Sequence, residues 1–323
     1  IKGGFEVTAD ESYSIGQIQI LNTDTNTAIK KINEQTNEIL KLANSKSNTL
    51  SKMNKGAKEI MCKEIDTPSG SMLIVELLID VGDAMGANVT NTMCEAVSPL
   101  IEKITGGKAL LRILSNYSTR RMVKAKAVFE KESVGGENVV DNIILAFEFA
   151  DNDVYRAVTH NKGIMNGIDS VVIATGNDFR AVEASAHSYA SIAGKYTSLS
   201  HANIVDDQFT FWMELPLSIG TVGGITNIHP LVKWCLQLLG NPSAKELMGI
   251  IAASGLAQNF AAVKSLITEG IQAGHMKMHL NNILNSLNAT NLEKQKITHL
   301  LSRSDISYSL VNQTLQNLRK GEY

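Results

Sequence analysis

Lys162 is a candidate for electrostatic chemistry because of the residues that surround it in the sequence. It lies in HNKGIMNGID (160–169), among Asn, Gly and small apolar residues, where Gly163 and Gly167 predict that the backbone bends. A lysine in such a loop is ordinarily solvated, and this is the alternative interpretation. The functional interpretation is a cation directed at a developing oxyanion, an interaction that is strong where water is excluded.

A carboxylate follows in ATGNDFRAVEASAH (174–187), where Asp178 comes after a predicted strand and near the start of a predicted helix. A carboxylate close to a lysine keeps the ammonium group charged and oriented. An aspartate at a helix start is also a standard N-terminal cap. Both interpretations of Asp178 stay open at this point.

A proton donor is available further along the chain at His275, directly after Gly274, where a predicted helix ends. His279 is four residues away, which is the spacing of a metal-binding pair. Because the sequence offers no evident third ligand and no glutamate between the two, we expect no metal. A histidine after a glycine hinge is able to move and to release a proton near neutral pH. His160 and His187 are interpreted as structural or supporting residues.

An anion site is predicted in IDVGDAMGANVTNTM (79–93), where a strand ends near Asp83 and a helix follows at once. Gly86 and Ala87 leave room for close approach to the N-terminus of that helix, which attracts anions. The alternative is an ordinary strand–helix turn. The sequence contains neither a G-x-G-x-x-G dinucleotide motif nor a P-loop.

The elements around this anion site predict a small domain of about a hundred residues, at 10–118. Strands are expected at 17–20, 59–65, 72–81 and 109–115, with one or two helices in 25–54 and a helix that ends at 106–107. The resulting β-α-β-β-α-β order is the ferredoxin-like pattern.

The other residues predict a larger, α-rich domain made of 1–9 and 119–274, so the fold class is α+β. Strands are expected at 123–129, 171–175 and 209–215, helices at 137–150 and 177–193, and further helices between 230 and 274. After residue 274 the composition shifts to Asn, Ser and Lys, and 275–323 is predicted to be a mobile helical segment.

The composition narrows the class of protein. The 323 residues contain 30 Lys and Arg against 32 Asp and Glu, which argues against nucleic-acid or anionic-membrane partners. We expect no membrane-spanning segment, because no apolar run approaches the ~18–20 residues that span a bilayer. The three cysteines contain no CxxC pair, so we expect reduced thiols and a cytoplasmic protein. The chain opens with Ile rather than Met, which we interpret as the loss of an upstream part.

Four stretches together resemble class II (bacterial and archaeal) 3-hydroxy-3-methylglutaryl-CoA reductase. DAMGAN (83–88) is similar to the family's nicotinamide-cofactor motif, and AVTHNKGIMNGID (157–169) to its catalytic-lysine segment. TGNDFRAVEASAH (175–187) resembles the catalytic-aspartate segment, and GLAQNFAAVKSLITEGIQAGHM (255–276) the approach to the catalytic histidine. The resemblance runs from about Gly3 to Met278.

The resemblance implies a homodimer with the site at the subunit interface, a small cofactor domain inserted in a large substrate domain, and a C-terminal flap. Lys162 would stabilise the oxyanion formed on hydride transfer, Asp178 would tune that lysine, and His275 would protonate the CoA thiolate. The implied activity is reduction of the thioester to mevalonate and CoA with two hydrides from NADPH or NADH, or the reverse reaction.

Binding residues follow from the same resemblance. The implied substrate contacts are Arg156, Asn116, Asn166 and Asn259, and the implied cofactor contacts are Asp83, Met85, Gly86, Ala87 and Asn88. NAD-preferring members can carry an acidic residue at the position of Ser47. Ser47 stands there with Lys41, Lys46 and Lys52 close by in the sequence, which favours NADPH or use of both cofactors. The alternative is that these lysines only solvate a helix face.

One part of the family pattern is missing. The family's catalytic glutamate lies in an E-x-x-S-V-V-A-A type segment before the cofactor domain, and no such segment occurs in these 323 residues. Truncation is the simplest account, and we expect the chain as given to be severely impaired. The alternative is a non-catalytic CoA-ester-binding relative that lost the glutamate. An unrelated dehydrogenase with convergent loops is a third hypothesis.

Overall fold

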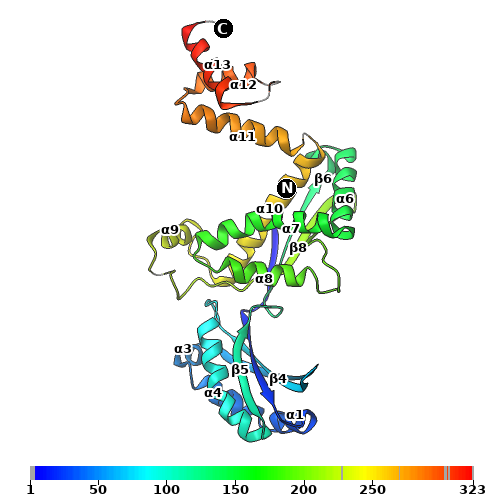
Figure 1. The fold of residues 1–323 in the computed structure, drawn as a ribbon, viewed down its shortest axis with the longest axis vertical. Coiled ribbons are helices and arrows are strands. Elements are labelled where there is room, and N and C mark those ends of the chain that lie inside the picture. The colour runs from blue at the N-terminus through cyan, green and yellow to red at the C-terminus, as the bar shows by residue number, and fades with distance from the viewer. Residues whose placement is uncertain (1–3, 227, 269, 302–303, 305, 322–323) are drawn as a thin grey trace. The chain divides into compact units, whose positions relative to one another are not determined.

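The computed structural model describes residues 4–226, 228–268, 270–301, 304 and 306–321, and for 271–278 it describes the backbone alone. The chain forms two compact units, Ile1–Asn259 and Phe260–Tyr323 (Figure 1). The first unit holds two four-stranded antiparallel sheets with helices packed on them. The α+β class predicted from the sequence is therefore confirmed.

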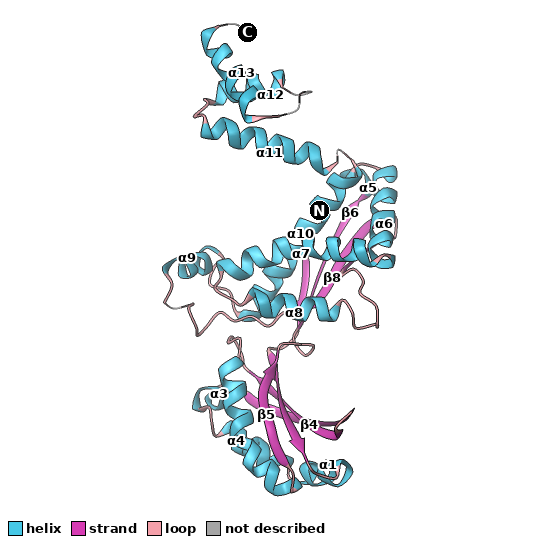
Figure 2. Cartoon of the chain, in the orientation of Figure 1, coloured by secondary structure: helices cyan, strands magenta, loops and turns pink. Residues whose placement is uncertain are grey.

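The smaller sheet has the predicted ferredoxin-like order. Its elements run along the chain as β2 (Tyr13–Leu21), α1 (Thr25–Glu34), α2 (Thr36–Asn44), α3 (Asn48–Lys52), β3 (Gly56–Thr67), β4 (Gly70–Asp80), α4 (Ala87–Thr105) and β5 (Lys108–Ser115). The strands lie in the order β3-β4-β2-β5, and the helices share one core with the sheet. Figure 2 shows α1, α3 and α4 on one side of the strands. The expectation of one or two helices in 25–54 was wrong, because Ser47 caps a third short helix, accepting a bond from the Leu50 N–H.

Helix α4 lies unusually close to the central strand β2. A Cβ built at Gly16 would stand 2.3 Å from the Cys94 Sγ and 2.9 Å from the Thr90 methyl group, so only glycine fits. The Thr90 hydroxyl also bonds the Ser14 hydroxyl at 2.9 Å. These contacts fix the N-terminal half of α4, which carries the predicted anion site at its first turn.

The larger sheet has the order β1-β6-β8-β7. Its strands are β1 (Glu6–Ala9), β6 (Met122–Glu130), β8 (Gln208–Pro216) and β7 (Ser200–Val205). The helices of this region are α5 (Lys131–Val134), α6 (Glu137–Asn152), α7 (Val154–Ala174), α8 (Phe179–Tyr189), α9 (Pro230–Leu238) and α10 (Ala244–Ile267). Val123, Ala125 and Ala127 of β6 are buried, as the alternation in the sequence predicted.

Helix α7 corrects two predictions. The expected loop around Lys162 and the expected strand at 171–175 are one continuous helix of 21 residues. Its buried positions include Ile164, Ile168 and Val172, at steps of four, so packing on a helical stripe overrides the β-branched residues and the glycines.

Gly167 has a packing role in α7 rather than a bending role. A Cβ there would lie 2.6 Å from the Ser254 carbonyl oxygen and 3.0 Å from the Gly255 Cα, both in α10. A Cβ at Gly255 would in turn stand 2.7 Å from Ile168. The two glycines therefore allow the helices to cross in close contact.

Helix α10 is long and apolar enough to cross a bilayer by length and composition, and no other helix among the described residues is. The expectation that no stretch reaches this length was therefore wrong. Leu247, Met248, Ile251 and Leu256 of this helix are fully buried, and 33% of its most apolar window is buried inside the protein.

The second unit contains α11 (Ile271–Ser286), α12 (Asn291–Leu300) and α13 (Tyr308–Lys320). Leu284, Ile297, Val311 and Leu315 form its core. The predicted helix end at Gly274 was wrong: α10 ends at Ile267, and α11 begins after Gly270, which has a φ of 81°. Helicity of the tail is confirmed, and its mobility stays a prediction.

Candidate active site

The predicted cofactor motif forms the turn between β4 and α4, and we call residues 81–86 the cofactor loop. Gly86 precedes α4 in the left-handed region, at a φ of 101°, and a Cβ there would stand 2.6 Å from a Val81 methyl group. The structure shows no side-chain cap on the N–H groups of the first turn of α4. This helix of 19 residues therefore presents unpaired N–H groups and its positive dipole end, which suit a phosphate.

The cofactor loop is joined to the larger domain by its own backbone and by Asp83. The Asp83 carboxylate accepts a bond of 2.8 Å from the Ala244 N–H, at the first residue of α10. Its carbonyl oxygen accepts a bond of 2.8 Å from the Thr221 N–H, and Ala84 pairs with Val222 as an isolated parallel bridge. Asp83 thus anchors the cofactor loop to α10, and its predicted cofactor contact stays a prediction.

Arg121 lies at the centre of this junction and was missed by sequence reasoning. Its side chain has no exposed surface, and its guanidinium donates to the backbone oxygens of Ala84 and Met85, at 3.4 Å each, and to that of Ile219. Burial lowers the pKa of Arg121 to about 10, while Asp83 and Asp80 act in the opposite direction, so the group is charged at neutral pH.

Lys162 projects from the middle of α7 and is exposed to solvent. Asn166 lies one turn further along the same helix face and is also exposed. No ion pair of Lys162 is present among the described residues. The ammonium group is therefore free to meet a ligand on the surface of α7.

Asp178 caps α8, as one of its two interpretations predicted. Its carboxylate accepts the Arg180 N–H at 3.0 Å and pairs with the Arg180 guanidinium at 2.8 Å. Hydrogen bonding to Arg180 lowers the pKa of Asp178, so the carboxylate is ionised at neutral pH. The structure thus pairs Asp178 with Arg180, and its predicted contact with Lys162 stays a prediction.

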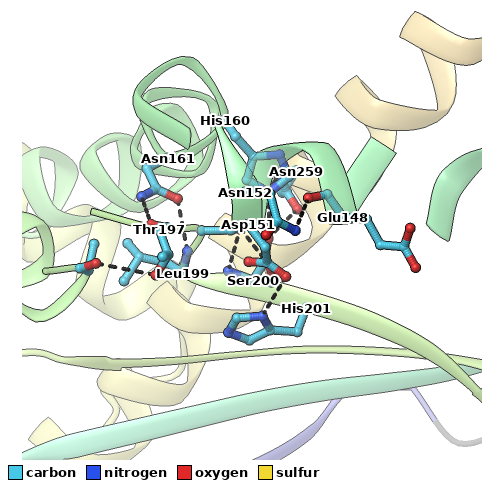
Figure 3. A network of polar contacts seen from close by, with 12 residues as sticks. Glu148, Asp151, Asn152, His160, Asn161, Thr197, Leu199, Ser200, His201 and Asn259 are labelled. Carbon is cyan, nitrogen blue, oxygen red and sulfur yellow. Dashed lines mark hydrogen bonds and ion pairs between the residues drawn. The ribbon is translucent and has the colours of Figure 1, made fainter. Parts of the chain in front are cut away.

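Asn259 is buried in a network with two residues that sequence reasoning assigned no role in binding (Figure 3). The Ser200 hydroxyl lies 2.9 Å from the Asn259 Oδ1 and 2.7 Å from the His160 Nε2, and the Asn259 amide nitrogen lies 3.1 Å from the same His160 nitrogen. Burial, and secondly the charge of Arg156, lower the pKa of His160 to about 4. His160 is therefore neutral and structural, as predicted, and Ser200 left no pattern in the sequence.

The remaining candidates lie in different surroundings. Arg156 is half-buried in the first turn of α7, and burial lowers its pKa. Asn116 is exposed just after β5. His275 belongs to α11 by its backbone, but its side chain lies outside the described residues. Among the residues that the structure describes, no group of three or more His, Cys, Asp and Glu is placed to hold a metal ion.

The described residues thus place the uncapped N-terminus of α4 beside the loop that follows β8, and comparison with known proteins shows the family. Residues 1–280 match the family model of hydroxymethylglutaryl-coenzyme A reductase. The chain is 46% identical over 319 residues to 3-hydroxy-3-methylglutaryl-coenzyme A reductase of Archaeoglobus fulgidus, a match that covers 98% of this chain and 73% of the relative. It is 37% identical over 255 residues to the probable enzyme of the same name from Borreliella burgdorferi, covering 76% of this chain and 59% of the relative.

Solved structures agree with the sequence comparisons. The 3-hydroxy-3-methylglutaryl-coenzyme A reductase of Streptococcus pneumoniae superposes with a TM-score of 0.81 at 38% identity, covering 98% of this chain and 77% of that one. The class II enzyme of the same organism bound to NADPH in open conformations gives a TM-score of 0.80 at 40% identity, covering 82% and 74%. The chain belongs to the hydroxymethylglutaryl-coenzyme A reductase family, a family of oxidoreductases, and the predicted resemblance is confirmed.

Proposed function

We propose that the protein reduces the thioester of 3-hydroxy-3-methylglutaryl-CoA to mevalonate and free CoA, using two hydrides from NADPH or NADH. The observation that carries this proposal is the cofactor loop, whose phosphate seat at α4 is bonded to the substrate domain through Asp83 and Arg121. The reverse direction, mevalonate oxidation, uses the same residues. A nicotinamide cofactor is further supported by the related enzyme bound to NADPH.

The chain's own residues suit the cofactor at three points. The free N–H groups of Ala87 and Asn88 would hold a pyrophosphate oxygen, and Gly86 leaves the space beside them open. The Met85 carbonyl oxygen, next to that seat, accepts a hydrogen bond from the Arg121 guanidinium. The bound nicotinamide would supply a hydride to the carbonyl carbon in each of two steps.

The roles of the acid–base residues follow from the chemistry of a thioester. Addition of hydride places negative charge on the carbonyl oxygen, which the exposed ammonium group of Lys162 would stabilise. Collapse of that oxyanion breaks the C–S bond, and His275 would protonate the departing thiolate. The resulting aldehyde accepts the second hydride, and its oxygen takes a proton from Lys162. Asp178, ionised and near the start of α8, would keep the lysine charged and oriented.

Substrate contacts would come from Arg156, Asn116 and Asn166, whose side chains are exposed or half-buried. Asn259 would act through the buried network with His160 and Ser200. Cofactor preference would be set near Ser47, where the lack of an acidic side chain favours NADPH over NADH.

The proposed organisation is a cytoplasmic homodimer, with a substrate domain at 1–9 and 119–274, a cofactor domain at 10–118 and a flap at 275–323. The nearly balanced charge of the chain supports neither a nucleic-acid nor a membrane partner. The second candidate function is that of a non-catalytic CoA-ester-binding relative, because no E-x-x-S-V-V-A-A type segment occurs in these residues.

Oxidation of NADPH and NADH in the presence of 3-hydroxy-3-methylglutaryl-CoA tests the proposal, with protein expressed from the gene's own start codon. Lys162→Ala should abolish substrate-dependent oxidation, whereas Lys30→Ala, which changes an exposed lysine on α1, should leave it intact. A folded wild-type protein that binds CoA esters but oxidises neither cofactor would favour the non-catalytic relative.

A further inference from the structure

The loop that follows β8 contacts both the cofactor loop and the segment that carries Asp178. Residues 219–222 of this loop, which we call the support segment, bond Asp83 and Ala84 through Thr221 and Val222. A Cβ at Gly220 would stand 2.4 Å from the Met85 nitrogen, so the two backbones touch where only glycine fits. The support segment and the cofactor loop are thus in direct contact.

The buried side chain of Arg121 bonds both the cofactor loop and the support segment. One arm of its guanidinium reaches the cofactor loop, at the Ala84 and Met85 oxygens, and the other reaches the Ile219 oxygen of the support segment. The Arg121 backbone also belongs to this junction, because its carbonyl oxygen accepts a bond of 3.0 Å from the Leu217 N–H. A buried cation that bonds only carbonyl oxygens fixes their spacing, since a shorter side chain could not reach all three.

Asn177 links the support segment to the other side of the site. Its Oδ1 accepts a bond of 2.7 Å from the Gly220 N–H, and its amide nitrogen lies 3.1 Å from the Thr175 hydroxyl. Asn177 directly precedes Asp178, the cap of α8. The position of the Asp178 backbone is therefore tied to residue 220, which in turn touches Met85 of the cofactor loop.

We propose that Arg121 and Asn177 are positioning residues that hold the cofactor loop and the Asp178 segment on one support, residues 219–222, so that the cofactor seat and the acid–base group keep a fixed spacing. The inference rests on the proposed function, and it assigns roles to two residues that contact neither the predicted phosphate seat nor Lys162. Its consequence is that a change at Asn177, on the substrate-domain side, should weaken binding of the cofactor.

A merely structural role would have a different outcome. It would lower the melting temperature and the folded fraction, while the folded molecules would bind NADPH with unchanged affinity. Positioning predicts weaker NADPH binding by folded protein, with binding of CoA esters retained. The Kd for NADPH, measured by the change in its fluorescence, and the Kd for CoA separate the two readings without any need for turnover.

The test uses Arg121→Lys, which keeps the charge but replaces the two donor nitrogens Nη1 and Nη2 with one, and Asn177→Ala, which removes the bond to Gly220. Asn177→Ala should fold even if Arg121→Lys does not. Arg120→Met is the matched control, because Arg120 is the adjacent arginine, is 45% exposed and pairs with Glu59 on the surface. Circular dichroism establishes the folded fraction of each protein. The double variant shows whether the two changes act through one element.

We expect each single variant to raise the Kd for NADPH about tenfold, which corresponds to ~1.4 kcal/mol, with the Kd for CoA unchanged. The Kd for NADPH of the double variant should rise by less than the product of the two single increases, since either change already frees the support segment. Wild-type affinity for NADPH in folded Asn177→Ala would overturn the inference, as would equal weakening in Arg120→Met. A wild-type protein that does not bind NADPH would instead contradict the proposed function.

Discussion

Protonation of His160 should make the fold sensitive to mild acid. The imidazole is 2% exposed, stands 2.7 Å from the Ser200 hydroxyl and packs edge-on against Phe147, with ring centroids 5.2 Å apart. Its Nδ1 is buried with no hydrogen-bond partner among the described residues, and its Nε2 faces the Asn259 amide nitrogen, which is a donor. An imidazolium, which needs an acceptor at both ring nitrogens, would therefore be poorly hydrogen-bonded. Burial is the main reason that its pKa falls from 6.5 to about 4, and the Arg156 cation one turn away is the second.

The sign and size of the effect follow from linkage. Between about pH 6.5 and 4 the unfolded chain holds a proton on residue 160 that the folded chain lacks, so the free energy of unfolding decreases as the pH falls. Each pH unit in this window costs about 1.4 kcal/mol. Lowering the pH from about 7 to 4.5 should therefore remove about 2 kcal/mol, which is a large part of a typical domain's stability.

The assay is urea denaturation followed by circular dichroism at several pH values, on wild type and His160→Gln. The glutamine amide can still bond Ser200 but does not titrate, so the pH dependence of its unfolding free energy should be shallower by about 2 kcal/mol over the same window. His229→Gln, which changes an exposed histidine before α9, is the control and should behave like wild type. Identical slopes for wild type and His160→Gln would refute the reasoning.

Three further tests use four substitutions. Gly167→Ala places a methyl group 2.6 Å from the Ser254 oxygen and should lower the free energy of unfolding by about 1–3 kcal/mol in urea denaturation. The Cβ of Gly163→Ala meets no atom within 4 Å, so this variant should raise that free energy by about 0.5–1 kcal/mol. Equal effects would contradict the close helix crossing. Asp178→Ala should lower the melting temperature, because it removes a helix cap worth about 1 kcal/mol. It should also abolish NADPH oxidation, and a variant that still oxidises NADPH would contradict the acid–base role of Asp178. Ser47→Asp should shift the ratio of kcat/KM from NADPH towards NADH, and an unchanged ratio would place cofactor selection elsewhere.

Local sequence patterns predicted the elements whose packing is regular. The alternation in 123–129 located β6, and the periodic apolar residues before Gly106 located α4, because each pattern reports a single buried face. The order of these elements was enough to predict the ferredoxin-like sheet.

The failures have a common physical cause, which is contact between residues distant in sequence. The run VVIAT (171–175) has strand propensity, but it continues the helix α7, in which Val172 is buried on the same stripe as Ile164 and Ile168. Arg121 adjoins the similar Arg120, and nothing local distinguishes them. Its partners lie 36, 37 and 98 residues away, so only the fold shows that it is buried.

The residues of the candidate site were also predictable only in part from the sequence. The resemblance named Lys162 and Asp178, and the structure adds that Lys162 is exposed on a helix and that Asp178 is bonded to Arg180. The structure also adds that the Asn259 amide bonds Ser200 and His160, and its predicted substrate contact stays a prediction. No local pattern could have shown Ser200 as its partner, because the two residues are 59 positions apart.

The most direct measurement of the central claim is the ratio of NADPH oxidised to CoA thiol released, in one reaction with 3-hydroxy-3-methylglutaryl-CoA and protein expressed from the gene's own start codon. Reduction of a thioester to an alcohol takes two hydrides, so the account predicts two molecules of NADPH for each thiol, with both signals lost in Lys162→Ala. NADPH oxidation without release of thiol, or a ratio of one with accumulation of an aldehyde, would contradict it.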